Sequence, residues 1–270
     1  MTAMAAKLMS PAETPAPATA LLDARNLVLQ YKTRDHLVTA AWDVCFQVLP
    51  GDRFILLGPS GCGKSSILKA VGGFLKPAAG SITLNGRTVA GPGPDRVMVF
   101  QDFEQLLPWK TVRDNVRFPM QASRRFPANE IARRADAVIE KVGLEGFAGA
   151  FPHMLSGGMK MRVAIARALA MEAEILLMDE PFAALDALTR LKMQQELLAL
   201  WQQTNFTMMF VTHSIEEAML VGSRILVLTP HPGRVRAELN SGDFGFDDQN
   251  GAAFSALKQK INGMLFEGKH

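Results

Sequence analysis

Apolar positions change their spacing several times along the chain, and each spacing predicts a different element. Between Leu27 and Val48 they partly alternate with polar positions, which predicts half-buried antiparallel strands. Residues 54–57 are all apolar and end at Gly58, as in a strand that is buried on both faces. Residues 64–71 have a helix-compatible spacing. The chain is therefore expected to open with a β-rich layer, a buried strand and a helix.

Two strand candidates and then a long helical region follow. The candidates are residues 81–84 and 97–100, on either side of a turn rich in Gly and Pro. From about residue 111 to residue 171 strand-like runs are absent and apolar residues recur at helical spacing. We therefore expect a helical subdomain at about residues 102–171.

Strand-like apolar runs return after this helical region. Residues 175–178 and 207–211 are two such runs, and the helical segment 188–201 between them is long enough to connect parallel strands. Another run lies at residues 225–228, and helical spacing returns near residues 252–264. This alternation predicts an α/β fold with a parallel sheet at its centre.

Length and composition indicate one large domain with appendages. The chain has 270 residues, of which 48% are hydrophobic and 20% charged, as in an ordinary globular protein. Residues 1–20 are rich in Ala, Pro and Thr, and we expect a disordered tail there, not a secretory signal. The main domain is expected at residues 21–240, and a C-terminal tail with a helix at residues 241–270.

Charge, cysteines and hydropathy exclude several function classes. The 29 basic and 26 acidic residues give a net charge of +3, which is too small to indicate binding to nucleic acid. Cys45 and Cys62 form neither a metal-binding cluster nor a CxxC pair, so a reducing compartment fits best. No apolar run approaches the ~20 residues that span a bilayer, so the chain itself is not expected to cross a membrane.

The strongest chemical motif follows the strand at residues 54–57. It matches the phosphate-loop pattern at every position: Gly58, Pro59, Ser60, Gly61, Cys62, Gly63, Lys64 and Ser65. The glycines let backbone N–H groups converge on an anion, and the following helix adds the positive end of its dipole. We expect Lys64 to reach the β- and γ-phosphates, Ser65 to bind Mg²⁺ and Ser66 to contact the α-phosphate. A plain Gly-rich turn is the alternative, which the complete match disfavours.

Two carboxylates follow the apolar run at residues 175–178. Asp179 and Glu180 lie at the carboxyl end of the predicted strand, where α/β folds bind their ligands. We expect Asp179 to hold Mg²⁺ through water and Glu180 to act as the general base for a water that attacks the γ-phosphate. Two acids that merely cap a strand are the alternative.

A further motif resembles the signature of one family, the ATPases of ABC transporters. Its residues are Leu155, Ser156, Gly157, Gly158 and Met159. The serine and glycines open a helix with unpaired N–H groups, which can bind an anion. In this family the anion is the γ-phosphate held by the opposite subunit. The resemblance extends over about residues 23–240 and implies a RecA-like parallel sheet with an antiparallel β subdomain and a helical subdomain.

Four other positions resemble landmarks of the same family. Tyr31 resembles the aromatic residue that stacks on adenine, and Gln101 resembles the glutamine that senses Mg²⁺ and the attacking water. Asp186 resembles the aspartate that communicates between two ATP sites, and His213 resembles the switch histidine that contacts the γ-phosphate. Taken alone, Tyr31 could equally be a packing residue, and Gln101 a solvated polar residue.

The sequence directly after His213 predicts how this side chain is positioned. Ser214 and Glu217 have the spacing of a capping box, in which each side chain bonds the backbone N–H of the other residue. Such a box fixes where the next helix begins, and therefore where the histidine before it points.

The signature ends in Met159, where the family most often has Gln. The chain resembles importer ATPases for nitrate, taurine and aliphatic sulfonates in this methionine. It also resembles them in residues 180–182 and 184–190. Residues 107–109 and 232–234 resemble the same subfamily. The resemblance implies an ATPase that drives the uptake of an anion of this kind.

Resemblance to this family also implies partners and a location. Two copies would face each other head to tail and enclose ATP and Mg²⁺, and membrane-spanning permease subunits would bind the ATPase at the cytoplasmic face of the inner membrane. A solute-binding protein would act indirectly, and no nucleic acid is implied. The candidates for gripping the permease are Phe103, Leu106, Leu107 and Trp109, although an apolar cluster after a strand is more often core.

Three other functions are alternatives for this sequence: an ABC ATPase of another importer or exporter class, an ABC-type ATPase that acts on nucleic acid, and a small-molecule phosphotransferase. DNA-repair relatives carry a long coiled coil between the glutamine and the signature, but here the interval from Gln101 to Ser156 is short. Ribosome-acting relatives join two cassettes in one chain. A phosphotransferase would leave the signature and His213 without a role.

Overall fold

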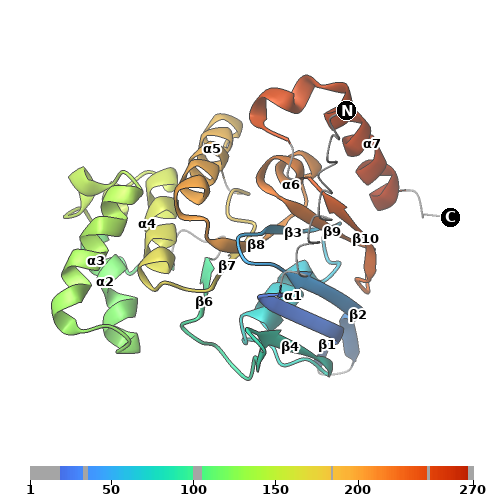
Figure 1. The fold of residues 1–270 in the computed structure, drawn as a ribbon, viewed down its shortest axis with the longest axis horizontal. Coiled ribbons are helices and arrows are strands. Elements are labelled where there is room, and N and C mark those ends of the chain that lie inside the picture. Colours follow the sequence, from blue (N-terminus) through green and yellow to red (C-terminus); the bar gives the residue numbers. More distant parts are fainter. Residues whose placement is uncertain (1–18, 33–35, 100–104, 184, 242–243, 267–270) are drawn as a thin grey trace, which may run out of the picture.

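The apolar runs predicted to be buried strands lie side by side in one six-stranded sheet (Figure 1). The structure is a computed structural model, and it describes residues 19–32, 36–99, 105–183, 185–241 and 244–266. In the order of the sheet, the strands are β10 (Val235–Asn240), β9 (Arg224–Leu228), β3 (Arg53–Leu57), β8 (Thr207–Thr212), β7 (Ile175–Asp179) and β6 (Arg96–Val99). All neighbours pair in parallel except β10, which runs antiparallel to β9 at the edge. The predicted parallel sheet is confirmed.

Successive side chains of the central strands enter two different hydrophobic cores. In β3, Ile55 and Leu57 belong to one core, whereas Phe54 and Leu56 belong to the other. Strands β7, β8 and β9 divide their residues between the same two cores. Because side chains alternate between the faces of a strand, an uninterrupted apolar run requires that both faces be covered.

One face of the sheet is covered by helix α1 (Lys64–Val71) and by a second, antiparallel sheet. The order of this sheet is β2 (Leu37–Val48), β1 (Leu22–Lys32), β4 (Ala79–Leu84) and β5 (Arg87–Thr88). Ile67 and Leu68 of α1 share the core with Val44 and Phe46 of β2. The predicted β-rich opening and the helix after it are confirmed.

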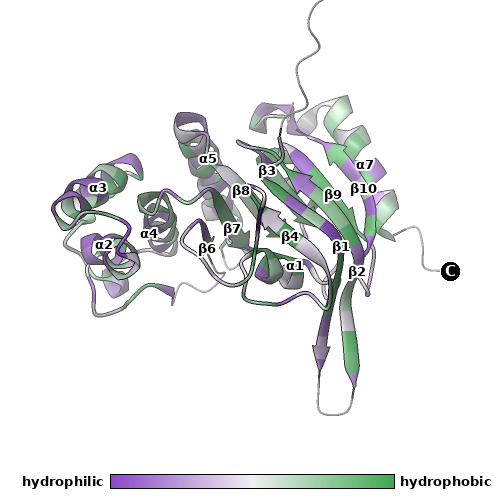
Figure 2. Ribbon diagram, turned by 60° about the horizontal axis from the view of Figure 1, so that its bottom comes forward, coloured by the Kyte–Doolittle hydropathy of each residue, from purple (hydrophilic) through white to green (hydrophobic). Residues whose placement is uncertain are grey.

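The predicted helical region lies to one side of the parallel sheet (Figures 1 and 2). Its main helices are α2 (Val112–Ser123), α3 (Ala128–Lys141) and α4 (Gly157–Ala170). Helix α2 begins where the hydroxyl of Thr111 accepts a hydrogen bond of 3.2 Å from the N–H of Asp114, which is a standard N-cap. The absence of strand-like runs in this part of the sequence therefore correctly predicted a helical region.

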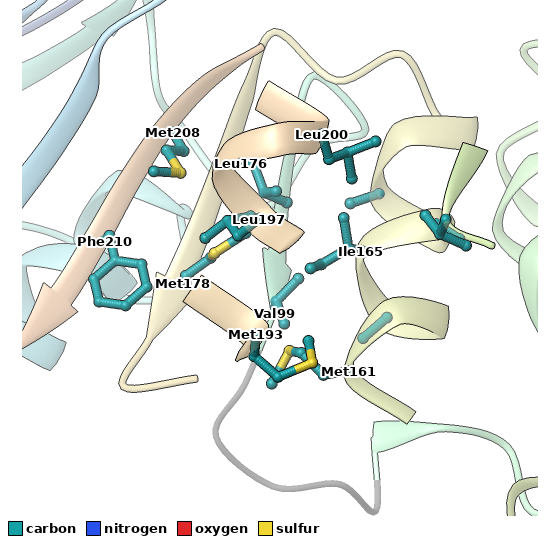
Figure 3. Packing of buried hydrophobic residues seen from close by; sticks show 14 of the residues in the cluster. Val99, Met161, Ile165, Leu176, Met178, Met193, Leu197, Leu200, Met208 and Phe210 are labelled. Carbon is teal, nitrogen blue, oxygen red and sulfur yellow. The ribbon is translucent and has the colours of Figure 1, made fainter. Parts of the chain in front are cut away.

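Helix α5 (Ala187–Thr204) connects β7 to β8 and joins the helical region to the sheet. Figure 3 shows side chains of α4 and α5 that meet those of the sheet strands. The helical side contributes Met161, Ile165, Met193, Leu197 and Leu200, and the sheet side contributes Val99, Leu176, Met178, Met208 and Phe210. The four methionines of this interface are fully buried or nearly so.

Helix α7 (Ala252–Phe266) is the last element that the structure describes, and it confirms the helix expected near residues 252–264. It packs against α6 (Ile215–Val221) and β9, and its Phe254 and Ile261 enter the same core as α4 and α5. An ion pair between Lys258 and Glu216 also links α7 to α6. The helix therefore contributes buried apolar surface to the fold. Of the helices that the structure describes, none has the length and apolar character that crossing a bilayer requires.

Two strands were not anticipated from the sequence. Strand β5 has only two residues, and both are exposed. Strand β10 is an edge strand in which half-buried and exposed side chains follow one another, so it has no apolar run that a pattern could detect.

We expect Ile261→Ala to lower the free energy of unfolding by about 2–5 kcal/mol, because it removes a fully buried side chain from the core. Lys260→Ala, at the exposed neighbouring position, should change it by less than about 0.5 kcal/mol. Urea denaturation followed by circular dichroism measures both. Equal midpoints for the two variants would show that α7 adds no stability.

Candidate functional site

The predicted phosphate loop connects β3 to α1 at the carboxyl edge of the parallel sheet. Gly61 and Gly63 have φ values of 78° and 91°, in the left-handed region that glycine enters without steric cost. A Cβ atom on Gly63 would also lie 2.4 Å from the carbonyl oxygen of Ala40. The shape of the loop therefore requires glycine at Gly63 for two independent reasons.

Lys64 lies at the start of α1 and is 5% exposed. Its Nζ donates hydrogen bonds of 2.8 Å and 2.9 Å to the carbonyl oxygens of Gly58 and Pro59. In the part of the chain that the structure describes, no carboxylate forms an ion pair with it. A buried ammonium group without a counter-charge is unfavourable, so an anion beside it would be stabilised.

Ser65 and Asp179 face each other across the start of α1 and the end of β7. The Ser65 hydroxyl donates a hydrogen bond of 2.8 Å to Asp179 Oδ1. Burial raises the pKa of Asp179, the bond from Ser65 opposes this change, and the neighbouring charge of Glu180 adds to it. Two hard oxygen donors this close suit Mg²⁺, which takes its other ligands from phosphate and water. Among the described residues no group of three or more His, Cys, Asp or Glu could hold a metal by itself.

Glu180 occupies a strained backbone position at the end of β7. Its φ is 46°, which costs a residue with a side chain about 1–2 kcal/mol. A hydrogen bond of 3.1 Å from its N–H to the carbonyl oxygen of Val211 holds it beside the end of β8. Its carboxylate Oε2 lies 3.1 Å from Nδ1 of His213. The predicted general base and the predicted switch histidine are thus direct neighbours.

A cavity of about 300 Å³ lies over the phosphate loop. Its lining includes Ser60, Gly61, Lys64, Ser65, Glu180 and His231. His231 was not predicted, since a histidine in a turn between two prolines belongs to no motif and to no periodic pattern. The cavity brings the loop together with the carboxylate that was predicted to act on a phosphate.

Tyr31 lies near the same loop, at the end of β1. Its hydroxyl donates a hydrogen bond of 2.9 Å to Ser66 Oγ, and its ring remains partly exposed. It pairs with Val38 across the two strands, and Val38 also lines the cavity. Its predicted stacking on adenine stays a prediction, but the packing alternative is disfavoured because Tyr31 lies outside both buried cores.

The residues of the signature motif lie away from the cavity over the phosphate loop. Ser156 caps α4 by accepting a hydrogen bond of 3.3 Å from the N–H of Met159, and Leu155 is buried beside it. Ser156, Gly157 and Gly158 line a second cavity of about 430 Å³, and none of them lines the cavity over the phosphate loop. Figures 1 and 2 show β6 and β7 between α4 and α1. The two predicted phosphate-binding motifs of the chain therefore line two separate cavities.

Asp186 lines the second cavity together with the signature residues. Its carboxylate caps α5 by accepting hydrogen bonds of 3.1 Å and 3.0 Å from the N–H groups of Leu188 and Thr189. Hydrogen bonding from Thr189 lowers the pKa of this carboxyl group. Asp186 is thus held as an anion at the start of α5, beside Ser156.

The capping box expected after His213 forms only in part. Ser214 Oγ accepts a hydrogen bond of 3.3 Å from the N–H of Glu217, as predicted. The carboxylate of Glu217 is instead buried and accepts a hydrogen bond of 2.8 Å from Gln194, and burial raises its pKa. The helix start after His213 is therefore fixed by one cap and by one buried contact to α5.

Other predicted residues fall in different surroundings. Gln101 and Phe103 lie outside the described residues, so their predicted roles stay predictions. Leu106 was a candidate for a surface groove, but it is 3% exposed and packs inside the core of the helical region, so this expectation is wrong. Leu107 is half-buried, and Trp109 is 71% exposed.

Comparisons with known proteins agree on one family. The profile of the family described as ABC transporter matches residues 42–183. The taurine import ATP-binding protein of Rhizobium johnstonii is 50% identical over 197 residues, which cover 73% of this chain and 74% of that protein. An ABC transporter ATP-binding protein of Methanocaldococcus jannaschii is 46% identical over 90% of this chain and 91% of its own length.

Solved structures show the same fold. An ATP-binding cassette in a dimeric, post-hydrolysis state with ADP and Pi bound is 33% identical, with a TM-score of 0.69, over 83% of this chain and all of that one. CbiO1 of Clostridium perfringens, part of an ABC transporter complex, is 27% identical with a TM-score of 0.74 and covers 90% of this chain and 94% of its own.

The two cysteines should differ strongly in their reaction with a maleimide at neutral pH. Cys45 is exposed, whereas Cys62 is fully buried in the phosphate loop, and burial raises the pKa of its thiol despite the opposing charge of Lys64. Because the thiolate is the reactive form, Cys62 should react slowly in the native chain, and faster as the pH rises. Mass spectrometry of peptides, with Cys45→Ser to isolate Cys62, measures both rates. Similar native rates for the two thiols would contradict this.

Proposed function

The chain belongs to the ABC transporter family, and we propose that it is the ATP-hydrolysing subunit of an importer for taurine or a similar sulfonate anion. ATP-binding cassettes of this family hydrolyse ATP, and importer ATPases in it form homodimers that work with membrane permeases. Beyond membership of this family, we propose the transported solute, the role of each site residue and the arrangement of the partners. Residues 21–240 form the ATPase domain in this proposal.

The buried Lys64 ammonium group is the single observation that supports the nucleotide site most strongly. Among the described residues its partners are two backbone carbonyls and the thiol of Cys62, and the N–H groups of a glycine-rich loop lie beside it. A triphosphate supplies the missing negative charge, with Lys64 on the β- and γ-phosphates and Ser66 near the α-phosphate. Tyr31, whose hydroxyl already contacts Ser66, stacks on adenine at the other end of the nucleotide.

Ser65 and Asp179 hold Mg²⁺ in this proposal, Asp179 through water, and Gln101 completes this side of the site. Bound Mg²⁺ neutralises charge on the β- and γ-phosphate oxygens. The 2.8 Å separation of the Ser65 hydroxyl and the Asp179 carboxylate supports this assignment. Because Asp179 has a raised pKa, its affinity for a cation should fall as the pH drops toward the acid range.

Hydrolysis requires a water in line with the γ-phosphate, and Glu180 is placed to accept its proton. Proton transfer to a positioned base contributes about 10²–10⁴-fold to a rate. His213 now lies 3.1 Å from the same carboxylate, and it contacts the γ-phosphate once ATP is bound. The strained backbone of Glu180 keeps the carboxylate at the end of β7, over the phosphate loop.

A second copy completes each site. The signature residues open α4 with unpaired N–H groups, but they do not line the cavity over the phosphate loop of their own chain. A head-to-tail dimer brings Ser156–Gly158 of one copy onto the γ-phosphate held by the other. Met159 and Leu155 hold this helix start in place, and Asp186 lies beside it, where it links the two sites. ATP therefore favours the closed dimer, and hydrolysis releases it.

The permease binds an exposed apolar surface of the helical region. Hydrogen bonds of 2.8 Å and 2.9 Å from the N–H groups of Val112 and Arg113 join the start of α2 to the segment 148–150. Trp109, Phe151 and Met154 expose 71%, 37% and 62% of their surface there. Large apolar side chains exposed in one region are typical of a protein interface. This surface faces a permease at the cytoplasmic side of the membrane, and a solute-binding protein delivers the solute to that permease.

Glu180→Gln should keep ATP binding but lower ATP turnover by at least about 100-fold, because it removes the base and keeps the shape of the side chain. ATP should then accumulate in a dimer that light scattering detects. Glu140→Gln, at an exposed carboxylate of α3, is the matched control and should turn over ATP at the parent rate. Parental turnover by Glu180→Gln would remove Glu180 from its proposed role.

The solute can be tested with the chain reconstituted in vesicles with its cognate permease and solute-binding protein. Taurine should raise the rate of ATP hydrolysis several-fold, whereas β-alanine, in which a carboxylate replaces the sulfonate, should not. Stimulation by nitrate alone would reject the sulfonate and keep the importer ATPase. If no anion stimulates hydrolysis and the complex is intact, the importer proposal fails.

A further inference from the structure

The turn between β9 and β10 is closed by its own hydrogen bonds. The N–H of Thr229 donates to the carbonyl oxygen of Arg234 at 2.9 Å, and the N–H of Arg234 donates to the Thr229 hydroxyl at 3.0 Å. The residues between them are Pro230, His231, Pro232 and Gly233. Two proline rings in this short segment restrict its backbone further. The turn is thus a defined structure of its own.

Gly233 attaches this turn to β2 and to the phosphate loop. Its N–H donates to the carbonyl oxygen of Ala40 at 3.0 Å, and its carbonyl accepts from the N–H of Trp42 at 2.9 Å. A Cβ atom at Gly233 would lie 2.0 Å from the carbonyl oxygen of Cys62, so only glycine allows this approach. The turn therefore rests directly on the middle of the phosphate loop.

This attachment brings His231 to the cavity over the loop. His231 lies two residues before Gly233 and lines that cavity together with Ser60, Gly61 and Lys64. Its imidazole is exposed, and among the described residues it has no hydrogen-bond partner. The other histidine near the cavity, His213, is already paired with Glu180. The His231 ring is therefore a free donor beside the predicted anion site.

The charges at the cavity favour an anion as the partner of this ring. Lys64 contributes a cation that forms no ion pair with the carboxylates that the structure describes, and the loop contributes N–H groups at the start of α1. Glu180 is the one carboxylate among the lining residues that the structure describes, and His213 lies against it. We propose that His231 is a nucleotide-binding residue, whose imidazole donates a hydrogen bond to a phosphate oxygen of ATP at this loop.

This inference rests on the proposed ATP site. One set of measurements distinguishes a failure of the inference from a failure of the ATP site. Calorimetry with the full chain gives the dissociation constants of ATP, ADP and inorganic triphosphate. His231→Ala should weaken all three by about tenfold, because a hydrogen bond to a charged group is lost. His231→Gln, which keeps an N–H donor, should recover part of the affinity. Thermal unfolding without nucleotide should be unchanged, because the side chain is exposed and unpaired.

Arg234→Ala is the matched control, because Arg234 belongs to the same turn but lies over the ring of Trp42 and does not line the cavity. It should bind ATP like the parent chain. Parental affinities in His231→Ala would overturn the inference, and so would weaker ATP binding with unchanged triphosphate binding, which would place the contact at the ribose or base. If the parent chain binds no ATP, or Lys64→Ala binds it equally well, the proposed ATP site itself fails.

Discussion

Among the described residues the Lys64 ammonium group bonds backbone carbonyls and forms no ion pair with a carboxylate, and much of the structure serves to maintain this arrangement. Strand β3 and helix α1 hold the loop from both ends, and both are fixed by the core on the side of the antiparallel sheet. Gly63 allows the loop to approach the backbone of Ala40 closely. An anion that enters this cavity would stabilise the Lys64 ammonium group, and Ser65, Glu180 and Tyr31 lie around the same loop.

The central sheet could be predicted from the sequence because its physical cause is local. A strand buried on both faces must be apolar at every position, so the runs around Ile55, Leu176 and Phe210 predicted both the strands and their burial. The phosphate loop and the two carboxylates after β7 could be predicted for a similar reason, since each is a contiguous motif in a fixed relation to its strand.

The remaining features depend on contacts between distant segments, which no local pattern encodes. Leu106 was expected at the surface, but the helical region closes over it, and the carboxylate of Glu217 bonds Gln194 of another helix instead of its own cap. His231 reaches the cavity because Gly233 packs on Cys62, although the two segments are far apart in the sequence. Each of these outcomes is set by tertiary packing, which overrides the local signal.

The interface between the helical region and the sheet is rich in methionine, with Met161 and Met193 on the helices and Met178 and Met208 on the strands (Figure 3). A thioether chain is unbranched and polarizable, and it can change rotamer to fill a gap that a branched side chain would leave empty. Small rotations of α4 relative to the strands would therefore open few voids. The same sulfur atoms make this interface sensitive to oxidation by peroxide. A methionine sulfoxide would place a polar oxygen in the buried interface and hinder the repacking of its side chains.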